Sequence, residues 1–168
     1  MDVVVTVGDV LDAPADVLIS TANPWLNMSG GVNGAIRARE PDIQSELRAH
    51  LESVGKTAIP ATSVVRTSAG SLPFSHIIHA VAIDPFYDSS QQIVADTLVA
   101  AFDLAVSLGA KSIAIPTLAT GYGPMTIDVF ARAFADSVLG RFPIETVTIV
   151  VRSEENAGII NSVLAAET

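Results

Sequence analysis

The chain reads Ser20-Thr-Ala-Asn-Pro-Trp-Leu-Asn-Met-Ser-Gly-Gly-Val-Asn-Gly-Ala-Ile36 directly after a strand-like apolar run, Val17–Ser20. This stretch holds three asparagines, three glycines and the only tryptophan of the protein. A connection that only had to reverse the chain would need fewer residues. We therefore expect this loop to hold a ligand rather than only to join two elements.

Similar apolar runs recur along the chain and alternate with helical patterns. Runs that are almost wholly apolar are typical of strands covered on both faces. The predicted strands are Val3–Val7, Val17–Ser20, Thr62–Arg66, Ile77–Ala82, Ile113–Ile115 and Thr146–Val151. The predicted helices are Ala35–Arg39, an exposed and charged Asp42–Val54, Gln91–Leu108, Thr126–Leu139 and a last helix capped by Ser153. This alternation predicts an α/β domain of three layers, α/β/α, around a mostly parallel sheet.

The composition limits the class of protein. The 168 residues fit one domain, 1–168, and 49% of them are apolar, which is far from the composition of a disordered chain. No apolar run is long enough to cross a bilayer and no secretory signal is visible, so we expect a cytoplasmic protein. The absence of cysteine excludes disulfides, a thiol nucleophile and a Cys-based zinc site. No His/Asp/Glu spacing suggests a metal site, and no cofactor is expected.

The net charge of −9 argues against phosphate-rich surfaces as partners. An acidic protein repels nucleic-acid backbones and anionic membranes, so neither is expected to bind. A small anionic ligand is still compatible with this charge if backbone N–H groups hold it at short range.

Two glycine-rich loops follow predicted strands and precede predicted helices. Gly30–Gly34 leads into the first helix, and Pro116–Met125 leads into the fourth. Glycines let the backbone approach a ligand, and a helix N-terminus adds unpaired N–H donors. Because both loops follow strands of one sheet, together they suit a diphosphate. The alternative is that both are ordinary strand-to-helix turns.

At this point the order of motifs resembles the macrodomain family over nearly the whole chain. The matching segments are Gly8-Asp-Val10, Ala15-Asp-Val-Leu-Ile-Ser-Thr-Ala-Asn23, Gly30-Gly-Val-Asn-Gly-Ala-Ile36, Val64–Thr67 with Ala69-Gly70, Ile77-Ile-His79 and Pro116–Gly123. The resemblance implies a macrodomain-like α/β/α fold with a mixed, mostly parallel sheet. It also implies ADP-ribose or ADP-ribosylated protein as the partner, and a monomer is expected.

The resemblance also assigns residues to the parts of such a ligand. Asp9 would accept a hydrogen bond from the adenine amino group, with the Val10 N–H beside the ring, and Asn23 would hold the distal ribose. Arg152 occupies the adenine-stacking position, where it either stacks on the purine or remains a solvated charge. The diphosphate would lie against backbone N–H groups of Gly30, Gly31, Val32, Thr120, Gly121, Tyr122 and Gly123.

Asn33 departs from the pattern of the hydrolytic macrodomains, which have Asp after Gly-Gly-Val. An amide can orient a water but cannot take its proton. Some related domains without this Asp still hydrolyse ADP-ribosylated protein, with a ligand phosphate assisting the water. The leading interpretation is therefore a de-ADP-ribosylating hydrolase acting on protein esters or O-acetyl-ADP-ribose, with Asn23 and Asn33 as catalytic residues. The alternatives are a non-catalytic ADP-ribose reader and a fold kept only for protein interaction.

Two further side chains are conspicuous in the sequence. His79 lies within an apolar strand, where a core residue is expected more often than a catalyst. Trp25 either folds over the first loop or packs beneath it, and the sequence does not separate the two.

Overall fold

The computed structural model describes residues 1–121 and 124–167 and has six strands in one sheet. Their order across the sheet is β1-β6-β5-β2-β4-β3. All neighbouring strands are parallel except β3, which runs antiparallel to β4 at one edge. The strands are β1 (Asp2–Val7), β2 (Val17–Ala22), β3 (Val64–Ser68), β4 (His76–Val81), β5 (Ser112–Ile115) and β6 (Thr146–Val151).

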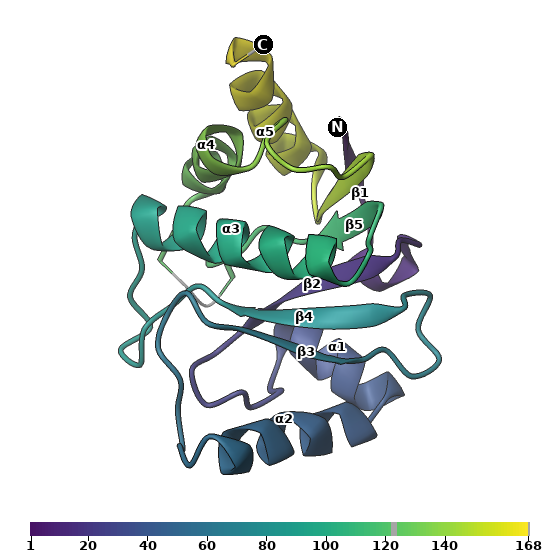
Figure 1. Cartoon of the computed structure of the whole chain (residues 1–168). Helices are drawn as coiled ribbons and strands as arrows, with labels where there is room; N and C mark the ends of the chain where they lie inside the picture. The colour runs from purple at the N-terminus through teal and green to yellow at the C-terminus, as the bar shows by residue number, and fades with distance from the viewer. Residues whose placement is uncertain (122–123, 168) are drawn as a thin grey trace.

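Five α-helices and one short 3-10 helix cover the two faces of the sheet (Figure 1). Helices α3, α4 and α5 form the layer on one face, and α1 and α2 form the layer on the other. The helices are η1 (Val10–Asp12), α1 (Gly31–Arg39), α2 (Asp42–Ser53), α3 (Gln91–Ser107), α4 (Ile127–Ser137) and α5 (Glu154–Ala166).

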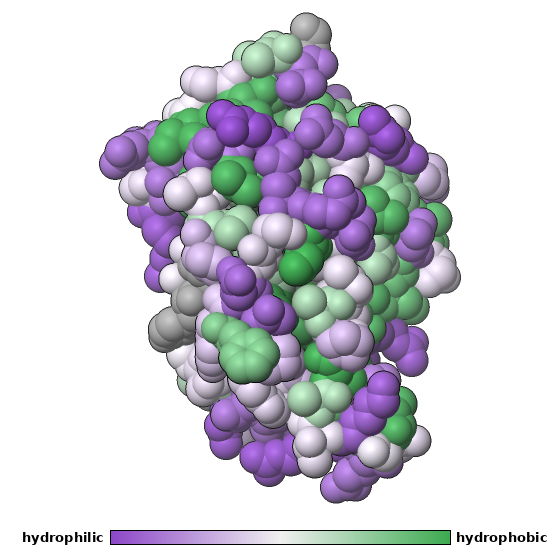
Figure 2. All heavy atoms as spheres, turned by 90° about the vertical axis from the view of Figure 1, so that its left-hand side faces the viewer, coloured by the Kyte–Doolittle hydropathy of each residue, from purple (hydrophilic) through white to green (hydrophobic). Residues whose placement is uncertain are grey.

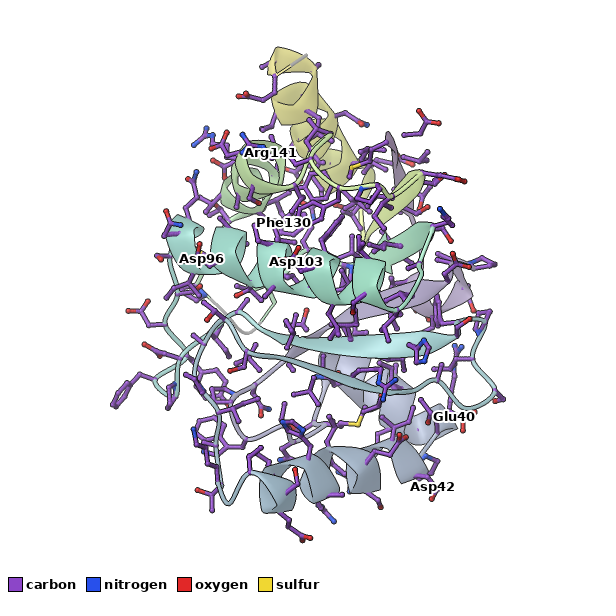
Figure 3. The ribbon with its side chains drawn as sticks, in the orientation of Figure 1. Glu40, Asp42, Asp96, Asp103, Phe130 and Arg141 are labelled. Carbon is purple, nitrogen blue, oxygen red and sulfur yellow. The ribbon has the colours of Figure 1, made fainter. Side chains whose placement is uncertain are left out.

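Two separate apolar cores hold these layers together. The larger core lies between the sheet and α3, α4 and α5, where Phe102, Phe130 and Phe134 are fully buried. Figure 3 shows Phe130 between α3 and α4, and Asp96 and Asp103 lie along α3, where both are exposed. One face of α3 is buried and the other is exposed to solvent, so the apolar residues of the buried face cover the sheet.

The predicted three-layer α/β/α fold with a mixed, mostly parallel sheet is confirmed. Several element boundaries differ from the sequence prediction, and two of these differences have a local conformational cause. The first helix begins at Gly31 rather than at 35, so the second glycine of the loop already belongs to the helix. The third strand begins at Val64 because Thr62 has a φ of 76°, a left-handed conformation that no strand residue adopts.

The second helix is exposed on one face, as its charge predicted, and buried on the other. Ile43, Gln44 and Leu47 are buried, because α2 packs its apolar stripe against the sheet. One face of the helix therefore belongs to the second core, and the other face carries its charged residues at the surface.

Candidate functional site

A cleft of about 800 Å³ lies at the carboxyl ends of the parallel strands. This is where α/β sheets place ligands, and the volume is within the usual range for small-molecule sites. The loops that form it lie at the left of Figure 1, and Figure 2 views the molecule from that side, where hydrophobic and hydrophilic residues are interspersed. The lining comes from Gly8, Asp9, Val10, Thr21, Ala22, Asn23, Ser29, Gly30, Gly31, Val32, Asn33, Ala35, Ile83, Tyr87, Pro116, Thr117, Ala119, Thr120, Gly121, Ile127, Val150, Val151, Arg152 and Asn156.

The first glycine loop presents the open N-terminus of α1 to this cleft. Gly30 is the N-cap with φ 68° and ψ 169°, a conformation that is almost restricted to glycine, and Gly31 follows at φ 56°. No side chain caps the helix and its first turn has no acidic residue. The first N–H groups of α1 have no intrahelical partner, so they can donate to an anion.

The second loop is stabilised by hydrogen bonds among its own residues. The hydroxyls of Thr117 and Thr120 lie 2.7 Å apart, and Thr120 donates to the Thr117 carbonyl at 2.9 Å. Ala119 has a φ of 63° and its carbonyl accepts from the Met125 N–H at 3.0 Å. A non-glycine residue in this conformation stores strain, which is common in loops that bind ligands. Of the predicted contacts, Thr120 and Gly121 line the cleft, whereas Tyr122 and Gly123 lie outside the described residues.

The Asn23 side chain lines the cleft and also braces its own loop. Its Oδ1 accepts from the N–H groups of Trp25 and Asn27, each at 3.1 Å, and its Nδ2 donates to the Asn27 carbonyl at 2.9 Å. One amide hydrogen is left without a partner in this set. Asn23 can therefore still donate one hydrogen bond to a ligand in the cleft.

Asn33 also lines the cleft, but its amide is directed to β2. Its Oδ1 accepts from the Ser20 hydroxyl at 2.8 Å, and its Nδ2 donates to the Thr21 carbonyl. The residue is 7% exposed. These bonds join the first turn of α1 to the end of β2, and so hold the adjacent glycines in place.

Asp9 lies at the other end of the cleft, after β1. Its Oδ1 accepts from the Leu11 N–H at 3.0 Å, and its Oδ2 lies 3.6 Å from the guanidinium of Arg39. Val10 is buried beside it. Because a carboxylate has about four acceptor positions, Asp9 can still accept from a ligand donor.

Arg152 follows β6, the neighbour of β1, and also lines this end of the cleft. Its guanidinium donates to the Gly8 carbonyl at 3.3 Å, and the side chain is exposed. The guanidinium plane therefore lies at the mouth of the cleft, tied to the loop after β1. Asn156, in the first turn of α5, lines the same end and was not predicted from the sequence. The local feature that could have indicated Asn156 is its position in the first helical turn after the Ser153 N-cap.

The end near Asn23 is apolar and aromatic. Ile83 and Tyr87, both from the loop between β4 and α3, line the cleft there and were not predicted. Trp25 is 38% exposed and its ring centroid lies 6.0 Å from that of Tyr87. Trp25 therefore neither packs beneath the loop nor lines the cleft, but contacts the ring that does. No local pattern in the sequence joins these two loops.

His79 lies beneath the site in the sheet and is fully buried. Its Nε2 lies 2.8 Å from the Thr67 hydroxyl, and its Nδ1 has no hydrogen-bond partner. Burial lowers the pKa of His79 to about 3, so the imidazole is neutral at physiological pH. It is a core residue, as the sequence favoured.

Within residues 1–121 and 124–167, no group of three or more His, Cys, Asp and Glu side chains is placed to hold a metal ion. In the same part of the chain, no helix is both long and apolar enough to span a membrane.

Comparisons with known proteins agree with this geometry. The Macro domain family model matches residues 19–134. A macro domain-containing protein of Listeria monocytogenes is 34% identical over 99% of both chains. An O-acetyl-ADP-ribose deacetylase of Klebsiella pneumoniae is 33% identical over 96% of this chain and 95% of its own. The solved Oceanobacillus iheyensis macrodomain with ADP has a TM-score of 0.86 at 26% identity, covering 96% of this chain and 89% of that one.

Proposed function

Because the chain belongs to the macro domain family, we propose that its cleft binds ADP-ribose and ADP-ribose conjugates. The observation that carries this proposal is the pairing of two loops at one edge of the sheet, each ending at a helix. A nucleoside diphosphate linked to a second sugar is long enough to contact both loops. The solved Oceanobacillus iheyensis macrodomain with ADP supports the same ligand class.

The diphosphate is assigned to the N–H groups of Gly30, Gly31 and Val32 on one side and of Thr120 and Gly121 on the other. Backbone amides and a helix N-terminus act at short range, so they stabilise the anion despite the net charge of −9. Tyr122 and Gly123 are assigned to the diphosphate from the sequence alone.

The two ends of the cleft are assigned to the two nucleoside parts. Asp9 has acceptor positions left after its bond to Leu11, which suits the amino group of adenine. The Arg152 guanidinium lies nearby and can stack on the purine. Asn23 retains one amide hydrogen for a hydroxyl of the distal ribose.

Hydrolysis of an ester on the distal ribose is the activity that we assign to this site. Relatives that are named O-acetyl-ADP-ribose deacetylases support it. Water would attack the acyl carbon, the bond between the acyl carbon and the ribose oxygen would break, and the ribose oxygen would take a proton. We assign Asn33 a positioning role, because Ser20 and Thr21 already occupy its amide.

A specific observation favours a second candidate function, that of a reader that binds ADP-ribose without hydrolysing its conjugates. Among the described lining residues, Asp9 is the only carboxylate and no histidine is present. Asp9 lies at the end opposite Asn23, so no described side chain can take the proton of the attacking water. Hydrolysis in this cleft would need a phosphate oxygen of the ligand as the proton acceptor.

The test compares Gly30→Ala with Gly109→Ala. Both glycines have positive φ, 68° and 79°, and Gly109 lies at the far end of α3, where an added Cβ meets nothing within 4 Å. Both variants place a Cβ at positive φ, which costs about 1–2 kcal/mol for left-handed backbone, but only Gly30 lines the cleft, at the N-terminus of α1. We expect Gly30→Ala to weaken ADP-ribose binding at least about tenfold by calorimetry, and Gly109→Ala to leave it within about twofold.

The same proteins are assayed for turnover of O-acetyl-ADP-ribose and of protein mono-ADP-ribosylated on Glu or Asp. Turnover by the wild type that falls with Gly30→Ala supports the hydrolase. Tight ADP-ribose binding without turnover at high enzyme concentration supports the reader. If ATP and NAD bind as tightly as ADP-ribose, or none of them binds, the assigned ligand class is wrong.

A further inference from the structure

Three aromatic side chains are exposed on loops beside the cleft, whereas Phe74, Phe102, Phe130 and Phe134 are buried. Phe86 is 89% exposed, Tyr87 is 48% exposed and Trp25 is 38% exposed. They come from two loops far apart in the sequence, the one after β2 and the one after β4. Exposed aromatic clusters of this kind mark places where another molecule binds.

The loop after β4 holds Tyr87 in an unfavourable backbone conformation. Its φ is 60°, which is uncommon for a bulky residue. Asp84 fixes the turn, since its Oδ1 accepts from Phe86 at 2.8 Å and from Asp88 at 3.0 Å. The Tyr87 N–H donates to the Asp84 carbonyl at 3.0 Å. The loop therefore holds the ring at the cleft at the cost of backbone strain.

Tyr87 connects the cleft with the outer surface. Its side chain lines the cleft, and its ring contacts Trp25, with centroids 6.0 Å apart. The Trp25 N–H in turn donates to Asn23 Oδ1, the amide assigned to the distal ribose. If the distal ribose lies at Asn23, as proposed above, a group attached to that sugar would leave the cleft beside this pair of rings.

We propose that Trp25 and Tyr87 form a docking rim for the polypeptide that carries the ADP-ribose group. This inference rests on the proposed function, because the direction of the ligand in the cleft comes from it. Trp and Tyr offer a rigid apolar face with one polar atom, which suits an extended peptide segment next to the modified side chain.

The charge and the size of the rim favour this occupant over a second copy of the chain. Asp84 and Asp88 lie in the same turn as Tyr87 and are not fully buried, so a segment with Lys or Arg beside the modified residue is complementary. Three aromatic side chains cover about 150–250 Å² each at most. That is less than the roughly 800 Å² per partner of a stable dimer, but it is enough for a short peptide.

The experiment measures binding of free ADP-ribose and of two peptides that carry it through a non-hydrolysable linkage, one with flanking lysines and one with flanking glutamates. The variants are Trp25→Ala and Tyr87→Asn, because asparagine tolerates left-handed backbone and keeps the turn. The control is Val4→Ala, which removes an apolar side chain 47% exposed on β1, at the other edge of the sheet. Thermal melting checks that each variant folds.

We expect the wild type to bind the lysine-flanked peptide about five to ten times more tightly than free ADP-ribose. Trp25→Ala and Tyr87→Asn should both remove this difference. Trp25 does not line the cleft, so Trp25→Ala should also leave the affinity for free ADP-ribose within about twofold, while Val4→Ala keeps both values. If the wild type binds the peptides and free ADP-ribose equally well, the proposed docking rim is wrong and the proposed function is unaffected. A Trp25→Ala variant whose affinity for free ADP-ribose falls as much as its affinity for the peptide overturns the rim as well. Absence of binding to every ligand overturns the proposed function together with the rim.

Discussion

The amide of Asn33 is held by both of its polar atoms at the base of the first loop. Oδ1 accepts from Ser20 and Nδ2 donates to the Thr21 carbonyl, and only 7% of the residue is exposed. A carboxylate in its place could still accept from Ser20. It could not donate, so one oxygen would face the Thr21 carbonyl without a proton between them.

Asn33→Asp is therefore expected to lower the free energy of unfolding by about 2 kcal/mol at pH 8, without gaining hydrolase activity. Burial would raise the pKa of the new carboxyl, and its protonated form can donate to Thr21. The stability that depends on this proton is present at low pH and lost as pH rises, so the deficit should be smaller at pH 5.

Urea unfolding at the two pH values measures this, with Asn161→Asp on the exposed side of α5 as control. A variant as stable as the wild type at pH 8, or one that turns over O-acetyl-ADP-ribose faster, would contradict the positioning role of Asn33.

Among the elements, α1 is tied at its C-terminal end to the turn between β3 and β4. Glu40, the C-cap of α1, accepts from both the N–H and the hydroxyl of Ser71. These bonds lower the pKa of Glu40. Gly70 lies against the same carboxylate at φ 56°, and an added Cβ would lie 2.3 Å from its Oε2. Figure 3 shows Glu40 at this end of the helix layer.

Gly70→Ala should therefore destabilise the protein more than Gly140→Ala. Gly140 has a φ of 70° and nothing within 4 Å of an added Cβ, so it reports backbone strain alone, about 1–2 kcal/mol. At Gly70 the added methyl also displaces the Glu40 carboxylate from Ser71. Urea midpoints at pH 7 measure the difference, and equal midpoints for the two variants would show that the tie contributes nothing.

At the scale of the whole molecule, the neutral buried His79 makes stability depend on pH. Burial lowers its pKa in the folded state to about 3 from the ordinary histidine value of 6.5, so the unfolded chain binds a proton that the folded protein does not. Stability is therefore complete above about pH 6.5 and falls as pH decreases. The expected loss is about 1.4 kcal/mol per pH unit, between about pH 6 and pH 4.5.

Chemical denaturation across this window measures the slope. His79→Gln removes the titrating group and can still bond to Thr67, so its slope in this window should be shallower than that of the wild type by about 1.4 kcal/mol per pH unit. Parallel curves for the two proteins would mean that His79 gains a proton in the folded state.

Local patterns were sufficient for most of the architecture. Apolar runs predicted every strand to within about two residues, since a strand covered on both faces has to be apolar throughout. The N-caps at Ser90 and Ser153 explain the starts of α3 and α5, because the bond from a cap is made within four residues. The start of α1 was predicted four residues late, because Gly30 caps it without a side chain.

The sequence by itself determined the order of the strands and helices, the two glycine loops and the family to which they belong. Only the tertiary structure decided what the side chains in those loops contact. Asn33 forms hydrogen bonds with Ser20 and Thr21, and Tyr87 lines the cleft beside Trp25. Asn156 lines the same cleft as Arg152. Hydrogen-bond partners and ring contacts depend on distances between segments far apart in the chain, and no local spacing encodes those distances.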